Sequence, residues 1–374
     1  MSQRPTVFTL TSMHAAGMRL LVEGAEVRMA SGLDPQTLRR EVVGADGLII
    51  RTGGVIDAAL LDCADRLKVV GRHGVGYDQI DVEAATERGI QVVYTPGANT
   101  ESVCEHVFAM MIGLSKHFPR MISALTAGNY HARTSMTGRD LLGRTLGIVG
   151  FGRIGRRVGE VARAGFGMRV LYHDIIGAPP EVEAKASATR VGFDEVLEAS
   201  EYLTLHVPLD KSTRHMIDAE ALSRMRPDAI LINAARGPIV VEKAVADALD
   251  ASTRHMIGPD ALARMRPDAI LINACRGPVV VEAAVVEALD AGRLWGFGAD
   301  VYEVEPPPRD HLLIGRPDVM LTPHSAAQTD EGLRNMAVGV VEDILGYLRG
   351  DPPRNPVNDP ATVLANRRRS GHSS

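Results

Sequence analysis

The chain has 374 residues, of which 45% are hydrophobic and 23% are charged, and its formal net charge is −5. This length allows two folded domains, and the mild negative charge argues against nucleic acid or an anionic membrane as the main partner. Three cysteines without CxxC spacing predict neither a disulfide framework nor a metal site. Since no signal pattern and no long apolar run is present, we expect a cytoplasmic protein.

Residues 5–100 alternate short apolar runs with helical stretches, which is typical of a small parallel α/β domain. After one apolar run comes a glycine-flanked loop, in which the amides of Gly74, Val75 and Gly76 could bind an anion such as a carboxylate. A simple tight turn would explain the same glycines. The expected elements are strands at Gly47–Ile50, Leu67–Gly71 and Ile90–Tyr94 and helices at Ile56–Ala64 and Val82–Arg88.

A long apolar helix is expected over Glu101–Lys116, and the basic residues 119–145 are expected to form a helix and an arm. The next stretch predicts one βαβ unit: a strand over Leu146–Val149, a glycine turn, a helix to about Ala164, and a second strand over Met168–Tyr172. Each turn glycine has a physical reason. Gly150 permits the tight turn, Gly152 permits close approach to a pyrophosphate, and Gly155 lets the helix pack on the sheet, with Arg153 and Ile154 completing the turn.

Asp174 ends the second strand, 19 residues after Gly155. A carboxylate at this place can accept hydrogen bonds from an adenosine ribose and repels a 2′-phosphate. The unit therefore predicts dinucleotide binding with NAD as the cofactor. Gly177–Ser187 is expected to be a surface excursion, and the strand Tyr202–Val207 should lead the cofactor-lining residues His206, Val207 and Pro208 into the crevice.

An internal repeat follows. Ser212–Ala251 and Ser252–Ala291 align without a gap, with 31 of 40 positions identical, which indicates a tandem duplication or an assembly artefact. Each copy predicts helix, strand and helix, and each strand leads to an arginine. The expected elements are Ala219–Met225, Ala229–Asn233 and Val240–Leu249 in the first copy, and Asp260–Met265, Ala269–Asn273 and Val280–Leu289 in the second.

Arg236 and Arg276 are both candidates for the arginine of the site, for different reasons. Because one repeat length lies between the two arginines, Arg236 keeps a short connection to the strand before Pro208, whereas Arg276 keeps a short connection to Asp300 and Glu305. We favour the second copy in the core with the first extruded, and Arg236 stays a candidate. With both copies in the sheet, one strand would separate the arginine from the Glu305 strand by an added spacing of about 4.8 Å, and we expect that arrangement to be inactive.

Further strands are expected to end at Val301 and over Val319–Leu321, followed by a helix from about Asp330 to Leu348. An arginine, Glu305 and His324 thus stand at strand ends of one sheet. A histidine can take or return a hydroxyl proton, a carboxylate favours its protonated form, and an arginine can hold a substrate carboxylate. The trio predicts hydride transfer between NAD and a 2-hydroxy acid.

The motifs GVGYDQID, PGANTESVCEH, LGIVGFGRIG, HVPL, LINAxRG, DVYEVEP and LTPHSA resemble those of the D-isomer-specific 2-hydroxyacid dehydrogenases. The resemblance implies a Rossmann-like doubly wound parallel sheet inserted into a smaller flavodoxin-like α/β substrate domain, and a homodimer formed through the nucleotide domain. His324 resembles the family's acid/base, Glu305 its partner, the INAxRG arginine its substrate-binding arginine, and Gly74–Gly76 its carboxylate-holding amides. Asp300 is expected to line the cofactor site.

The expected organisation is a substrate domain over residues 1–118, an NAD domain over 119–323 that contains the repeat, a helix over 324–349 that returns to the substrate domain, and a disordered, solvated tail over 350–374. Two functions stay open. One is an active dehydrogenase that acts on a small 2-hydroxy or 2-keto acid. The other is a catalytically impaired NAD-binding protein or an NAD-sensing interaction scaffold, which the repeat would favour.

Overall fold

The structure is a computed structural model that describes residues 4–208, 212–226, 228–235, 239, 269–274 and 280–369. It divides into two compact units. Unit 1 contains residues 1–99 and 327–374, and unit 2 contains residues 100–326. Within the described part of the chain, no helix is long and apolar enough to span a membrane.

Unit 1 is built on a parallel five-stranded sheet in the order β2-β1-β3-β4-β5. Helices cover both faces: α2, α3 and α4 contribute to one hydrophobic core, and α1 and α13 to the other. The predicted elements between residues 47 and 94 are confirmed with small shifts at their ends. The bounds are β1 Thr6–Thr9, α1 Ala15–Gly24, β2 Glu26–Met29, α2 Pro35–Glu41, β3 Gly47–Ile50, α3 Ala58–Cys63, β4 Val69–Arg72, α4 Val82–Glu87, β5 Gln91–Val93, α13 Asp330–Arg349 and α14 Pro360–Arg369.

The expectation of a disordered tail is wrong for residues 350–369. Asn358 is buried and its side-chain oxygen accepts a hydrogen bond from the backbone of Val92 (2.8 Å). Helix α14 follows, with Val363 fully buried. Arg367 donates to the carbonyl of Lys68 (2.8 Å). This arginine therefore binds backbone carbonyls of unit 1, where composition alone predicted a solvated charge.

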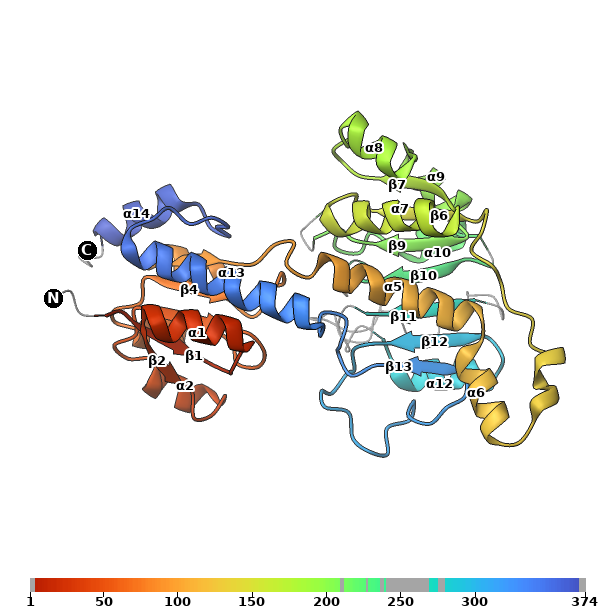
Figure 1. The fold of residues 1–374 in the computed structure, drawn as a ribbon, viewed down its shortest axis with the longest axis horizontal. Coiled ribbons are helices and arrows are strands. Elements are labelled where there is room, and N and C mark those ends of the chain that lie inside the picture. Colours follow the sequence, from red (N-terminus) through yellow and green to blue (C-terminus); the bar gives the residue numbers. More distant parts are fainter. Residues whose placement is uncertain are drawn as a thin grey trace. The chain divides into compact units, whose positions relative to one another are not determined.

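Unit 2 contains a parallel eight-stranded sheet in the order β13-β12-β11-β10-β9-β6-β7-β8. Figure 1 shows α5 and α7 across one face of this sheet, and α9, α10 and α12 pack on the other. The bounds are α5 Thr100–Ser115, α6 Phe118–Thr126, η1 Tyr130–Thr134, β6 Thr145–Val149, α7 Arg153–Phe166, β7 Arg169–His173, α8 Pro180–Ala186, β8 Ala188–Arg190, α9 Phe193–Ala199, β9 Tyr202–Leu205, α10 Ala219–Arg224, β10 Ile230–Asn233, β11 Ile270–Asn273, α12 Glu282–Asp290, β12 Gly296–Ala299 and β13 Val319–Leu321.

Two predictions about unit 2 differ from the structure. The predicted boundary after residue 118 assigns α5 to the first domain, whereas α5 belongs to unit 2 because its apolar side chains, such as Met110 and Met111, pack on the unit 2 sheet. The predicted surface excursion at Gly177–Ser187 contains α8, which precedes the edge strand β8. The segment lies at the surface as predicted, with Ala186 its one buried residue, but it forms a helix.

The expectation that the first repeat copy is extruded is also wrong for its strand. Both β10 and β11 lie in the sheet, side by side and in register, so that Ile230 pairs with Ile270 and Asn233 with Asn273. All four residues of each strand are buried. A strand buried on both faces is stabilised inside a sheet and would expose apolar surface outside it. The predicted helices Val240–Leu249 and Asp260–Met265 lie outside the described residues.

Candidate active site

The glycine turn predicted from the sequence joins β6 to α7. Gly150 has a φ of 92°, and a Cβ atom there would lie 2.7 Å from the backbone nitrogen of Val207. At Gly155 an added Cβ would lie 2.2 Å from the carbonyl oxygen of Gly150, so the helix approaches the turn closely. At Gly152 it would meet nothing within 4 Å, and no side chain caps α7. Open space beside an uncapped helix N-terminus fits a pyrophosphate.

Asp174 lies directly after β7, beside this turn. Its carboxylate accepts hydrogen bonds from the backbone N–H groups of Phe151 (2.7 Å) and Ile176 (3.1 Å). The acid is therefore held at the carboxyl end of the sheet and next to the glycine turn, as the spacing predicts. The arrangement fits the ribose of a dinucleotide at the end of the second strand.

The segment His206–Pro208 follows β9, so it also lies at the carboxyl-terminal ends of the strands. The His206 backbone donates to the carbonyl of Val149 (2.7 Å), which ties this segment to the end of β6. The His206 ring nitrogen Nε2 lies 3.0 Å from the Thr204 hydroxyl. Burial lowers the pKa of His206 to about 3, so its imidazole is neutral at physiological pH.

His324 and Glu305 form the hydrogen-bonded pair that the sequence predicts. His324 Nδ1 lies 2.8 Å from Glu305 Oε2, and the side chains are 51% and 38% exposed. His324 has a φ of 52°, an uncommon backbone conformation for a residue other than glycine and one that occurs at functional sites. Glu305 Oε1 accepts from the Tyr302 backbone (3.1 Å), which fixes the carboxylate on the side opposite the histidine.

Asp300, expected from the sequence to line the cofactor site, binds the loop that carries His324. Its buried carboxylate accepts hydrogen bonds from the Thr322 hydroxyl (2.6 Å) and from the backbone N–H groups of Ser325 (2.7 Å) and Ala326 (2.9 Å). His106 Nε2 lies 3.8 Å away, and burial lowers the pKa of this histidine. The contacts of Asp300 hold residues 322–326 in one conformation.

The remaining predicted site residues divide into two groups. Arg236 and Arg276 lie outside the described residues, although the strands before them are described. The loop Gly74–Gly76 belongs to unit 1, where it follows β4. The Gly74 N–H donates to the Thr95 hydroxyl (2.9 Å), so this amide is engaged within unit 1. Val75 and Gly76 are the amides of the loop that stay candidates for a carboxylate.

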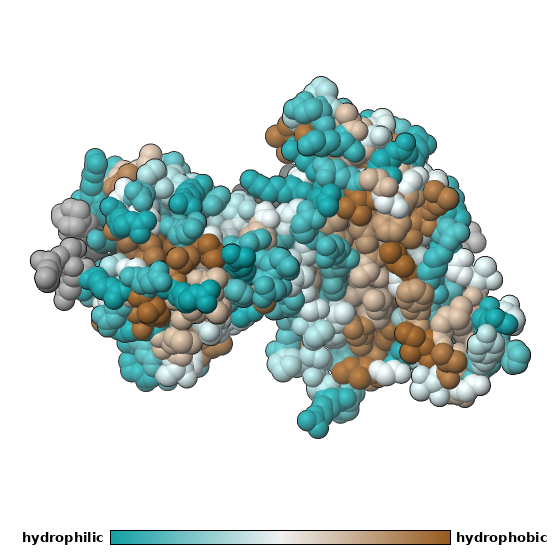
Figure 2. Space-filling model, viewed as in Figure 1, coloured by the Kyte–Doolittle hydropathy of each residue, from teal (hydrophilic) through white to brown (hydrophobic). Residues whose placement is uncertain are grey.

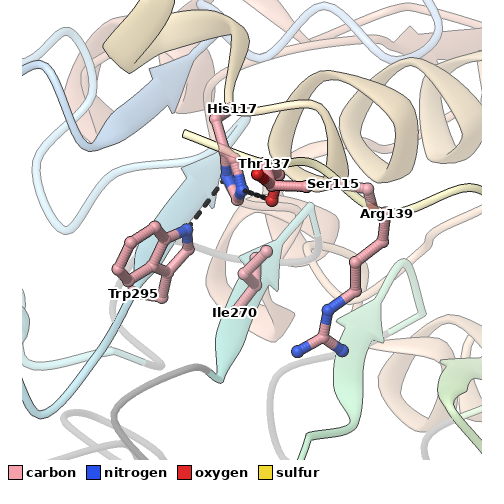
Figure 3. A pocket seen from close by; sticks show the side chains of 6 residues that line it. All are labelled: Ser115, His117, Thr137, Arg139, Ile270 and Trp295. Atoms are coloured by element: carbon pink, nitrogen blue, oxygen red, sulfur yellow. Dashed lines mark hydrogen bonds between the residues drawn. The ribbon is translucent and has the colours of Figure 1, made fainter. Parts of the chain in front are cut away.

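A cavity of about 170 Å³ in unit 2 lies near the amino-terminal ends of the strands, away from the glycine turn (Figure 3). Ile270 is the first residue of β11, and Trp295 precedes β12, so the cavity adjoins the amino ends of these strands. Its polar groups bind one another: the Trp295 indole donates to His117 Nδ1 (2.9 Å), and His117 Nε2 lies 3.1 Å from the Thr137 carbonyl. Because dinucleotides bind at the carboxyl ends of parallel strands, this cavity is not the nucleotide site.

A second histidine–carboxylate pair was not predicted. His311 Nε2 lies 2.7 Å from Glu282 Oε2, with both side chains 10% exposed. Neither residue stands in a motif that the sequence analysis used. Glu282 lies in the second repeat copy, and His311 follows DVYEVEP by five residues. A buried contact between residues 29 positions apart is not visible in a one-dimensional pattern.

A model of the D-isomer specific 2-hydroxyacid dehydrogenase NAD binding domain matches residues 108–253 and 249–326. The chain is 34% identical over 349 residues to a D-3-phosphoglycerate dehydrogenase of Methanocaldococcus jannaschii, covering 93% of this chain and 58% of the relative. It is 33% identical over 361 residues to a glyoxylate reductase of Korarchaeum cryptofilum, covering 95% and 96%.

Among solved structures, the D-lactate dehydrogenase of Aquifex aeolicus complexed with NAD and lactic acid is similar, with a TM-score of 0.70 and 26% identity, covering 94% of this chain and 98% of that one. The alignments to these relatives cover 93–95% of this chain, and the residues matched by the domain model include the glycine turn, Glu305 and His324. The chain therefore belongs to the D-isomer specific 2-hydroxyacid dehydrogenases, a family of NAD-dependent oxidoreductases.

Proposed function

We propose that this protein interconverts a D-2-hydroxy acid and its 2-keto acid, with the nicotinamide cofactor held at the glycine turn of unit 2. The observation that carries the proposal is the His324–Glu305 hydrogen bond of 2.8 Å, on loops that follow β13 and β12 of the sheet that also supplies the turn. When bound, NAD accepts a hydride from the alcohol carbon, and NADH returns it to the carbonyl. Gly150, Gly152, Gly155 and Asp174 would hold this cofactor.

In this proposal His324 moves the proton. Since its Nδ1 binds Glu305, its Nε2 is the atom that takes the hydroxyl proton in oxidation and returns it in reduction. The Glu305 carboxylate fixes the orientation of the imidazole through Nδ1, so that Nε2 stays available for proton transfer. Asp300 and Tyr302 hold the loops on which these two residues stand.

We assign the substrate-binding arginine to Arg276. It follows β11 by three residues, and β11 pairs directly with β12, which leads to Glu305. Arg236 follows β10, which is separated from β12 by β11. A guanidinium can bind the substrate carboxylate with two hydrogen bonds and polarise the keto oxygen. The amides of Val75 and Gly76 in unit 1 are assigned to the same carboxylate.

The relatives named as phosphoglycerate dehydrogenase and glyoxylate reductase define the substrates to test. We expect the purified full chain to oxidise NADH, followed at 340 nm, with at least one of glyoxylate, hydroxypyruvate, pyruvate and 3-phosphohydroxypyruvate. His324→Gln should lower kcat by about 10²–10⁴-fold, the usual contribution of a general acid, while NADH still binds. NADH binding without turnover of any keto acid by the unmodified chain would overturn the proposal.

The proposal includes a homodimer formed through α6. This helix buries none of its residues and exposes Phe118, Ile122 and Leu125 at 49%, 65% and 62%. Figure 2 shows hydrophobic residues gathered along α5 and α6 on this face. An exposed apolar face of this kind is typical of a subunit interface. We also place the protein in the cytoplasm, consistent with the free thiols of Cys63 and Cys104.

Analytical ultracentrifugation tests the dimer. Ile122→Glu puts a charge in the proposed interface and should yield monomers at concentrations where the unmodified protein is a dimer. Val22→Glu is the matched control, because Val22 is 56% exposed on helix α1 of unit 1, and it should leave the dimer unchanged. Equal sedimentation of all three proteins would rule out α6 as the interface.

A further inference from the structure

We propose that Glu282 and His311 are positioning residues that hold Glu305 against His324. The proposal rests on the function proposed above, since it concerns the same histidine. It assigns a role in the reaction to a buried, hydrogen-bonded glutamate–histidine pair that is separate from the proposed catalytic pair.

The Glu282 carboxylate joins three segments of unit 2. Glu282 is the first residue of α12 and is 7% exposed. One of its oxygens, Oε2, lies 2.7 Å from His311 Nε2, and the other, Oε1, accepts a hydrogen bond from the Glu303 backbone (3.1 Å). Because both oxygens are engaged, the carboxylate cannot turn without breaking a contact to one of the other two segments.

The protonation of His311 suits this contact. The Leu313 backbone N–H donates to His311 Nδ1 at 3.4 Å, so the ring proton lies on Nε2 and faces Glu282. The His311 ring also packs edge-on against Tyr302, with ring centroids 5.7 Å apart. His311 therefore contacts the turn that carries Glu305 both through Glu282 and directly through Tyr302.

The turn Tyr302–Glu305 transmits the position of Glu282 to the active site. Two consecutive backbone N–H groups of this turn are bound by different carboxylates: Tyr302 N–H by Glu305 (3.1 Å) and Glu303 N–H by Glu282 (3.1 Å). The other oxygen of the Glu305 carboxylate, Oε2, lies 2.8 Å from His324 Nδ1. A displacement of Glu303 therefore moves the donor that orients Glu305.

Tyr302 adds a second connection to the histidine loop. Its hydroxyl donates to the Thr322 carbonyl (3.0 Å), two residues before His324. Burial, together with the nearby carboxylates of Asp300, Glu282 and Glu305, raises the pKa of Tyr302 to about 12. The hydroxyl stays protonated at physiological pH and keeps donating. The turn is thus held on one side by Glu282 and on the other by the loop that bears His324.

The test compares two substitutions of Glu282 with a control substitution of Glu287 in the full chain. Glu282→Gln keeps an oxygen for the Glu303 N–H but sets its NH2 group against the His311 Nε2–H, so it should lower kcat, and less than Glu282→Leu. Glu282→Leu removes both contacts and should lower kcat for keto-acid reduction by about 10–100-fold, the cost of a displacement on the order of 1 Å. The dissociation constant for NADH should change less than about twofold, because Glu282 follows β11 and not the glycine turn. Glu287→Leu, at an exposed site of the same helix, is the matched control.

The pH profile separates positioning from a purely structural role. His324 is faced by Glu305, and its loop is bound by Asp300, beside which His106 lies. If Glu305 loosens, His324 loses the hydrogen bond at Nδ1 that orients it for proton transfer, so the pH dependence of kcat for reduction should differ from that of the unmodified chain. A structural role would lower Tm and leave the pH dependence of kcat unchanged.

The outcomes are distinguishable. No turnover by the unmodified chain contradicts the proposed function itself. Turnover with unchanged kcat and an unchanged pH profile in Glu282→Leu contradicts the positioning role alone. Should Glu282→Leu fail to fold, Glu282→Asp decides. Its carboxylate is one methylene shorter and cannot reach both His311 and the Glu303 N–H, so kcat should fall and the pH dependence of kcat should change. Retention of both would overturn the proposal.

Discussion

The two repeat copies have nearly the same sequence and different neighbours. The strand of each copy reads ILIN, and both strands are buried in the unit 2 sheet. However, β10 lies between β9 and β11, whereas β11 lies between β10 and β12. Identical local sequences therefore form identical strands, but the place of each strand in the sheet depends on the segment to which its ends are joined.

This difference changes distances within the active site. Three strands, β9, β10 and β11, separate β6, which leads to the glycine turn, from β12, which leads to Glu305. One of the three would be missing if the repeat were present once. The additional strand adds about 4.8 Å along the sheet between the glycine turn and the Glu305 strand, while β11 and β12 remain neighbours. Since catalytic geometry tolerates displacements of roughly 0.5 Å, we expect the unmodified chain to turn over slowly. The two copies are thus equivalent for folding and not equivalent for catalysis.

The largest expected effect distinguishes the two arginines. Arg276→Ala should lower kcat/KM for keto-acid reduction by about 10²–10³-fold, since it removes the group that stabilises charge on the keto oxygen. Arg236→Ala should change it less than about threefold, because β11 stands between its strand and β12. Steady-state kinetics of both variants measure the difference. The reverse ranking would show that the first copy supplies the arginine.

The βαβ unit could be predicted because each of its features is local. An apolar strand, the turn glycines Gly150, Gly152 and Gly155, and Asp174 after the second strand all lie within 29 consecutive residues. The pair of His324 and Glu305 could be predicted in the same way, because both follow short strands of one sheet. These are contacts that strand order and spacing determine.

The features that were missed depend on contacts between distant segments. Arg367 and Asn358 are ordered by backbone groups near residues 68–92, and composition carries no information about that surface. The place of both repeat strands in the sheet depends on the hydrogen bonds that β9 and β12 offer. Likewise, Glu282 and His311 become recognisable only when α12 and the loop after β12 are packed together.

A deletion tests whether the added strand affects catalysis. Removing residues 212–251 joins Lys211 to Ser252 and keeps Arg276, Glu282, Glu305 and His324. We expect β11 to take the place beside β9 and the glycine turn to come one strand spacing closer to His324. The rate of keto-acid reduction should rise about tenfold or more, a change of about 1.4 kcal/mol in the barrier. An unchanged rate in a folded deletion variant would mean that the longer sheet already has productive geometry.

The smallest effect tests whether both strands are inside the sheet in solution. Ile232 and Ile272 occupy the same position of β10 and β11, are both fully buried, and belong to the same hydrophobic core. Ile232→Val and Ile272→Val should each lower the free energy of unfolding by about 0.5–1.5 kcal/mol, which for a domain of this size shifts Tm by roughly 1–6 °C. Calorimetry of the two variants should give similar shifts. If one copy were extruded, the substitution in its strand would leave Tm unchanged, because an exposed methylene creates no cavity, and that variant would identify which copy is outside.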